Sequence, residues 1–166
     1  MNARTLSGIV FVSLVAAGCG HMETHGGGGG ELRERPPTTQ ECKTPTCQID
    51  VDVVTRTRNG AAINTIVVVD ELLVLKDNHG QGGNGVRIIW HVTNPQYCMR
   101  DDSIQFYEDA ARNQFRAPGT GGDGKEFHWT DANTDSSRHY YGYQLKVYNC
   151  RTGDWIPLDP GIWNGY

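Results

Sequence analysis

Two glycine-rich segments come close to phosphate-binding motifs, and each lacks a component that this chemistry requires. Gly80–Gly85 has the spacing G-x-G-x-x-G, but residues 86–92 alternate apolar and polar like a strand, whereas a dinucleotide site needs a helix there. Gly119–Lys125 nearly completes a phosphate-binding loop, but Glu126 stands where Ser or Thr would hold Mg²⁺. We expect both segments to be loops, the first a hairpin loop with positive φ angles.

One acidic segment resembles a calcium-binding loop in part. Asp131, Asn133 and Asp135 repeat the first three ligand positions of an EF-hand. The loop's glycine position is Ser136 and its final Glu position is Gly142, so an EF-hand is excluded. Asp and Asn side chains also form turns through their own backbone, which is the expected role here. A calcium site of another type stays open.

Catalysis by familiar side-chain sets has little support. No serine after residue 18 lies in a G-x-S-x-G motif, and His91 and His128 fall on the polar phase of expected strands, where surface imidazoles lie. A copper site of the cupredoxin type would need a His and a Met after Cys150, and neither occurs. Two adjacent acid pairs could serve glycoside hydrolysis, but a small sandwich has little room for a cleft; they are Asp101-Asp102 and Glu108-Asp109. We expect a protein that is not an enzyme, with no catalytic residue, no cofactor and no assigned metal ligand.

The first 18 residues have the features of an export signal. Arg4 precedes the apolar run Ile9–Ala17, which is too short to span a bilayer but has the length of a signal-peptide core. The segment ending at Cys19 resembles the bacterial lipobox, with Ala16 where that class prefers Leu. The resemblance implies that Cys19 becomes the lipid-modified first residue. Gly20 after it, rather than Asp, implies the outer membrane of a Gram-negative bacterium.

Without Cys19, the chain has an even number of cysteines: Cys42, Cys47, Cys98 and Cys150. In an exported chain this number indicates two disulfides, with three possible connectivities. A Cys42–Cys47 bridge would close a short loop around a proline turn, and Cys98–Cys150 would then close a loop of about 50 residues. A zinc site has less support, because the chain lacks C-x-x-C and a Cys/His cluster.

Residues 19–40 have the composition of a tether, and the domain is expected at 41–166. The tether holds five consecutive glycines, Gly26–Gly30, and then Pro36-Pro37, which favour flexible and extended chain respectively. The whole chain of 166 residues has 15 basic and 19 acidic side chains, a net charge of −4. This balance argues against nucleic-acid binding, which needs a basic face.

Short alternating segments separated by Gly, Asn, Asp and Pro predict a β-rich domain. Its only helix candidate is one turn at 108–113. We expect strands at 48–56, 64–75 (one kinked strand or two), 85–93, 103–107, 125–130, 139–148 and 155–158. Tyr141 opens a late strand after an Asp-rich turn, which resembles the tyrosine corner of Greek-key sandwiches, and Trp90 would be central in the core. The fold class expected is all-β: an immunoglobulin-like antiparallel β-sandwich of seven or eight strands.

Residues 48–164 also resemble a group of small exported proteobacterial β-sandwich proteins. The resemblance implies the fold and export, and it supplies no catalytic residues. It rests on Ile88-Ile89-Trp90, on the Asp131-x-Asn133 turn before Tyr141-x-Tyr143, and on the terminal motif Asp159-Pro160-x-Ile162-x-Asn164.

Three aromatic residues near the chain end form a candidate binding patch: Trp155, Trp163 and Tyr166. Exposed together they would make a recognition surface; the favoured alternative is that the terminal segment packs across the open end of the sandwich. We therefore expect a lipid-anchored, non-catalytic binding or accessory module of the cell envelope, with a protein or glycan partner. The alternatives are an inhibitor or immunity-type lipoprotein acting on an exported enzyme, and a small envelope hydrolase.

Overall fold

The computed structural model describes residues 38–165, so the expected export signal, Cys19, most of the expected tether and Tyr166 lie outside the described residues. β1 begins at Thr39, within the last two residues assigned to the tether. Among the described residues, no helix has the length and apolarity needed to cross a membrane. The elements are β1 (Thr39–Cys42), β2 (Thr46–Arg58), β3 (Ala61–Val67), β4 (Glu71–Val74), η1 (Gln81–Gly83), β5 (Val86–Val92), β6 (Tyr97–Cys98), β7 (Ile104–Phe106), α1 (Ala111–Gln114), β8 (Phe115–Gly121), η2 (Gly122–Gly124), β9 (Glu126–Asp131), β10 (His139–Asn149), β11 (Trp155–Leu158) and β12 (Gly161–Asn164).

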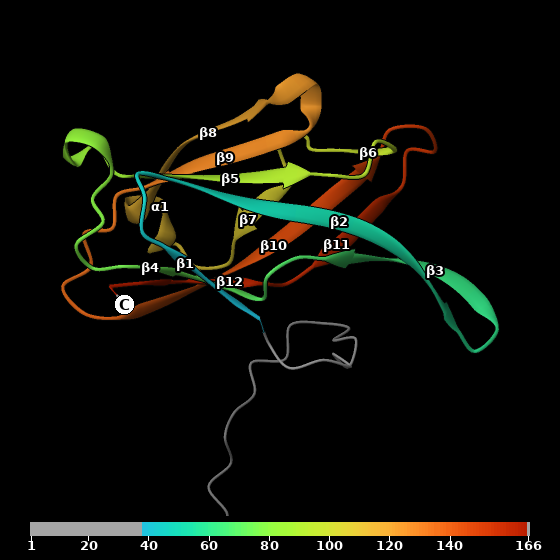
Figure 1. Cartoon of the computed structure of the whole chain (residues 1–166), viewed down its shortest axis with the longest axis horizontal. Coiled ribbons are helices and arrows are strands. Elements are labelled where there is room, and N and C mark those ends of the chain that lie inside the picture. Colours follow the sequence, from blue (N-terminus) through green and yellow to red (C-terminus); the bar gives the residue numbers. More distant parts are fainter. Residues whose placement is uncertain (1–37, 166) are drawn as a thin grey trace, which may run out of the picture. The chain divides into compact units, whose positions relative to one another are not determined.

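The described strands form two sheets that pack face to face (Figure 1). The five-stranded sheet has the order β3-β2-β5-β9-β8. The seven-stranded sheet has the order β1-β4-β12-β10-β11, with β6 and β7 also paired to β10. The expectation of a β-sandwich with almost no helix is therefore confirmed.

The sandwich differs from the expected one in strand number and direction. It has twelve strands in the described range rather than seven or eight, and three strand pairs are parallel: β1 with β4, β4 with β12, and β2 with β5. The parallel pairs arise because the chain changes sheet between consecutive strands, at residues 43–45, 68–70 and 75–85. Whether two strands pair in parallel or antiparallel depends on these crossings. The alternation of apolar and polar residues along a strand does not reveal them.

The segment Gly80–Gly85 is one of these crossings, so its prediction as a hairpin loop is wrong. It joins β4 and β5, which belong to different sheets. Its glycines do have positive φ angles, as expected, and Gly85 at φ 94° lies directly against the backbone of Asp131. A methyl group at Gly85 would lie 2.6 Å from the Asp131 carbonyl oxygen.

β11 and β12 form one interrupted strand along β10. Leu158 pairs with Leu145 and Gly161 pairs with Gly142, so both strands share a single register. The interruption falls at Asp159-Pro160, because proline has no N–H for the ladder. The terminal segment therefore lies within the sheet and does not cross the open end of the sandwich.

Alternate residues of β10 and β5 fill the space between the sheets. Trp90 and Tyr143 are buried, with ring centroids 5.4 Å apart, and the Trp90 Nε1–H donates to the Tyr143 hydroxyl at 2.9 Å. Tyr141 is also buried, and its hydroxyl donates to the Asp135 carboxylate at 3.1 Å. A tyrosine corner would bond to backbone, so this interaction is a side-chain version of that motif.

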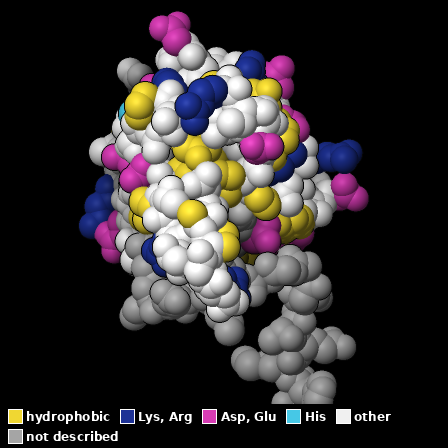
Figure 2. Space-filling model, turned by 90° about the vertical axis from the view of Figure 1, so that its right-hand side faces the viewer, with side chains coloured by type: hydrophobic (Ala, Val, Ile, Leu, Met, Phe, Trp, Pro, Cys, Tyr) yellow, Lys and Arg dark blue, Asp and Glu magenta, His cyan; other side chains and the backbone are white. Residues whose placement is uncertain are grey.

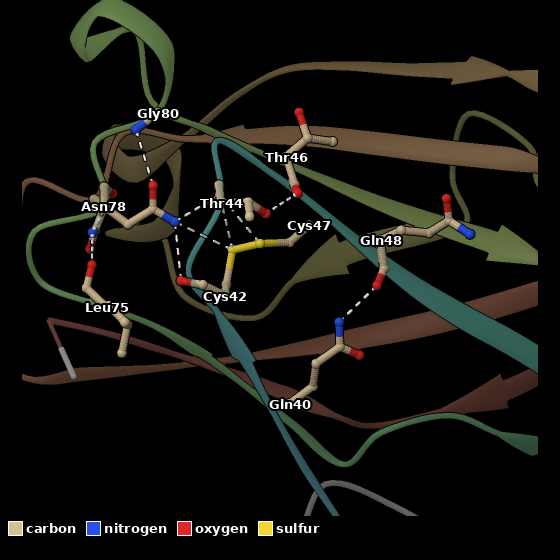
Figure 3. Close-up of a disulfide and its surroundings, with 10 residues drawn as sticks. Gln40, Cys42, Thr44, Thr46, Cys47, Gln48, Leu75, Asn78 and Gly80 are labelled. Carbon is tan, nitrogen blue, oxygen red and sulfur yellow. Dashed lines mark hydrogen bonds between the residues drawn. A yellow bond between two sulfur atoms is a disulfide. The ribbon is translucent and has the colours of Figure 1, made fainter.

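Two disulfides fix irregular parts of the fold. Cys42–Cys47, with Cα atoms 5.7 Å apart, closes the turn where the chain passes from one sheet to the other (Figure 3). Asn78 Nδ2 donates to the carbonyl oxygens of Cys42 and Thr44 and so holds this turn. The second disulfide, Cys98–Cys150, has Cα atoms 6.0 Å apart and joins β6 to the residue after β10.

Candidate functional site

The outer face of the seven-stranded sheet carries a row of aromatic side chains. Inward residues of β10 alternate with outward ones, and Phe106 of β7 points inward while Tyr107 points outward. We call the outward set the aromatic strip; its members are Tyr107, Tyr140, Tyr148, Trp155 and Trp163. Three of them are the exposed large hydrophobic residues of the described chain: Tyr107 at 59%, Tyr140 at 39% and Trp155 at 38%.

At one end of the strip, Tyr140 packs against Trp163. Their ring centroids are 5.0 Å apart, and the Arg138 guanidinium lies 4.8 Å from the centre of the Trp163 ring. The Tyr140 ring lies over Gly161, where a methyl group would be 2.2 Å from it. Glycine at this position therefore lets the ring lie flat on the sheet.

Tyr107 occupies the middle of the strip in a similar way. Its ring lies over Gly142, where a methyl group would be 3.2 Å away, and its hydroxyl donates to the Asp159 carboxylate. Partial burial, followed by this hydrogen bond, raises the pKa of Tyr107 well above its usual range. The phenol thus stays protonated and holds its ring in one orientation.

At the other end, Trp155 packs against Tyr148 with ring centroids 5.1 Å apart. Lys146 Nζ lies 5.0 Å from the centre of the Trp155 ring and 3.0 Å from the Asp102 carboxylate. Arg100 lies 4.8 Å from the centre of the Tyr148 ring. Figure 2 views the side where β3, β6 and β11 lie, and apolar side chains form a broken band there with charged side chains on its borders.

Two residues of the predicted patch, Trp155 and Trp163, are therefore part of a longer surface. Trp155 and Trp163 share the outer face, but eight strand positions place them about 26 Å apart. Tyr166 lies outside the described residues. Sequence reasoning missed Tyr107, Tyr140 and Tyr148. Tyr140 and Tyr148 lie on the polar phase of β10, and a tyrosine at such a position is the signal that could have indicated an exposed ring.

In the described part of the chain, the two acid pairs have separate surroundings. Asp101 and Asp102 border an open pocket of about 360 Å³, lined also by Met99, Arg100, Thr120 and Gly124. The other pair makes surface contacts only: Glu108 with His139 at 3.3 Å and Asp109 with Arg112 at 3.5 Å.

The two strand histidines have other neighbours. His91 Nδ1 lies 3.5 Å from the Asp50 carboxylate. The pKa of His128 is lowered by burial and secondarily by Arg87. In the part of the chain that the structure describes, no group of three His, Cys, Asp or Glu side chains could hold a metal ion.

The segment with partial calcium-loop spacing is split between two environments. Asp135 accepts hydrogen bonds from Gln114 Nε2 at 2.9 Å and from the Tyr141 hydroxyl. Asp131 is instead buried, and its Oδ1 accepts from the Asn133 backbone N–H at 2.9 Å and from Asn164 Nδ2 at 3.0 Å. Burial raises the pKa of Asp131 to about 6, although both hydrogen bonds act against this shift.

Comparison with known proteins assigns no family. A scan against protein-family models and a search of curated proteins both found no match. The functional interpretation therefore rests on the residues and their geometry.

Proposed function

We propose that this protein is a lipid-anchored, non-catalytic binding module of the cell envelope, an immunoglobulin-like domain that contacts a protein partner through the aromatic strip. The observation that carries the proposal is five Tyr and Trp rings along one sheet face, with cationic side chains beside three of them. Tyr, Trp and Arg are the residues that contribute most to protein–protein binding energy.

The strip is also held rigid before any partner binds. The Tyr107 hydroxyl is fixed by Asp159, and Tyr140 and Trp163 hold each other at 5.0 Å. Rigid aromatic side chains lose little conformational entropy on binding, so their burial is converted more fully into affinity. An exported enzyme inhibited by this protein would be one partner of this kind.

Photocrosslinking in the producing bacterium tests the proposal. A photoreactive phenylalanine analogue at Tyr107 or Trp155 should yield a discrete protein adduct, since both rings are exposed on the strip. The same analogue at Arg87, an exposed position on the five-stranded sheet, is the matched control and should yield none. The adduct at Tyr107 should disappear when Trp155→Ala is added.

Two results would contradict this assignment. Equal yields of crosslinked adduct at Tyr107 and Arg87 would show that the aromatic strip is not the binding surface. A glycan ligand would give three results together. No protein adduct would form, an envelope polysaccharide would retard the protein in a gel, and Trp155→Ala would abolish that retardation.

A further inference from the structure

Three buried oxygen atoms at one end of the sandwich have no hydrogen-bond donor. They are Asp131 Oδ2, Asn133 Oδ1 and Asn164 Oδ1. The three side chains are 0%, 2% and 0% exposed, respectively. Asp131 ends β9 in one sheet and Asn164 ends β12 in the other, so this group, the oxygen cluster, lies between the sheets.

Hydrogen bonds fix the orientation of both amide groups. Asn133 Nδ2 donates to the carbonyl oxygens of Leu75 at 2.8 Å and Asn78 at 2.9 Å, so its Oδ1 faces elsewhere. Asn164 Nδ2 donates to Asp131 Oδ1 at 3.0 Å. Rotating the Asn164 amide by 180° would place its oxygen against the carboxylate instead, which would be repulsive. The orphan atoms are therefore all acceptors, and the two Asn residues contact the same carboxylate oxygen.

Three buried acceptors need more than one donor can provide. A water molecule has two hydrogens and so could serve at most two of them. A proton on Asp131 Oδ2 would turn that atom into a donor for one Asn oxygen and leave the other Asn oxygen without a donor. A cation contacts all of its oxygen ligands at once.

We propose that the oxygen cluster is a Ca²⁺ site, with Asp131, Asn133 and Asn164 as side-chain ligands that join the two sheets. Carboxylate and amide oxygens are the ligands that Ca²⁺ takes, whereas Mg²⁺ keeps several waters and suits a buried site less well. Asp135, the third residue of the partial EF-hand spacing, is not a ligand, because Gln114 and Tyr141 occupy its carboxylate. Asn164, 31 positions beyond Asn133 in the chain, takes its place.

Terbium luminescence tests the site directly. Trp129 lies two residues before Asp131 on β9, roughly 7 Å along the strand, within range to sensitise a bound Tb³⁺ ion. We expect Tb³⁺ emission on tryptophan excitation of the chelator-treated, disulfide-bonded full chain. Ca²⁺ should displace Tb³⁺ and should raise the midpoint of thermal unfolding.

Three variants separate this site from the alternatives. Asn164→Ala should weaken Ca²⁺ binding by about tenfold or more, because ligand number and charge set affinity over orders of magnitude. Asn164→Asp should bind Ca²⁺ more tightly than the parent chain, and it covers the case in which the alanine variant fails to fold. Asp135→Asn is the matched control, an acid of the same sequence motif, and should bind Ca²⁺ as the parent does.

Three outcomes would overturn the proposal. One is Tb³⁺ emission no higher than in Asp131→Asn, with no Ca²⁺-dependent shift in unfolding. Another is a response to Na⁺ or K⁺ alone, which would exclude a divalent site. The third is a pair of results: Asp135→Asn loses Ca²⁺ binding, and Asn164→Asp binds Ca²⁺ with the parent's affinity. Together they would place the ion at Asp135 rather than at Asn164.

Discussion

At the scale of single residues, the hydrogen bond between Trp90 and Tyr143 shows how a polar group is kept inside this core. Both side chains are buried, one from each sheet, and the Tyr143 hydroxyl oxygen accepts the hydrogen bond that the Trp90 N–H donates. A buried N–H that loses its acceptor keeps the cost of leaving water without the compensating bond. Loss of the Tyr143 hydroxyl should therefore lower the stability of the fold by more than the small size of that group suggests.

We expect Tyr143→Phe to lower the free energy of unfolding by about 1–3 kcal/mol, because it leaves the Trp90 indole N–H without an acceptor. Urea unfolding followed by tryptophan fluorescence measures this. Tyr148→Phe is the matched control, since the Tyr148 side chain lies on the outer face of the same strand and is half-buried. Equal losses in the two variants would show that the indole bond contributes nothing specific.

The residue scale is also where sequence reasoning was partly successful. Trp90 and Tyr143 fall on the apolar phase of alternating strands, so their burial could be predicted. The contact between Asp131 and Asn164 could not, because it joins side chains 33 positions apart in different sheets. The same limit applies to Tyr107, whose position over Gly142 depends on which strand pairs with β10.

At the scale of elements, strands with strict alternation were predictable, and those defined by their neighbours were not. β2, β5, β9 and β10 alternate clearly and appear close to their expected bounds. β8 contains Pro118 and glycines and has a register shift between Arg116 and Gly119, so it lacks a period-two pattern. β1 and β12 are short strands with parallel neighbours, and such pairing is fixed by chain crossings rather than by local composition.

The crossing that ends at Gly85 gives a second prediction. Gly85→Ala should destabilise the fold by about 3 kcal/mol or more, because a positive φ costs an alanine about 1–2 kcal/mol and the methyl group would also clash with the Asp131 carbonyl. Gly60→Ala is the matched control, with φ +79° but open space around the new methyl group, and should cost only the backbone term. Thermal or urea unfolding of both variants gives the difference; similar losses would show that the close packing at Gly85 is unimportant.

At the scale of the whole molecule, the two features proposed for function lie in different parts of the sandwich. The aromatic strip lies along the outer face of the seven-stranded sheet, whereas the oxygen cluster lies between the two sheets where β9 and β12 end. Asn164 ends the strand that carries Trp163, one residue away. Ion binding would therefore stabilise one end of the strip without taking part in its surface.

The proposed lipid anchor gives the last prediction, because it would determine where this surface is presented. Cys19→Ser should move the protein from the membrane fraction to the soluble fraction, since the cysteine sulfur is the atom that would carry the lipid. Gly20→Asp is the matched control: it keeps the sulfur, and by resemblance to Gram-negative lipoproteins it should retain membrane attachment but shift the protein to the inner membrane. Sucrose-gradient separation of the membranes distinguishes the two outcomes. Unchanged partitioning of Cys19→Ser would contradict the proposed anchor, and the proposed binding module would then have to reach a partner without a tether to the membrane.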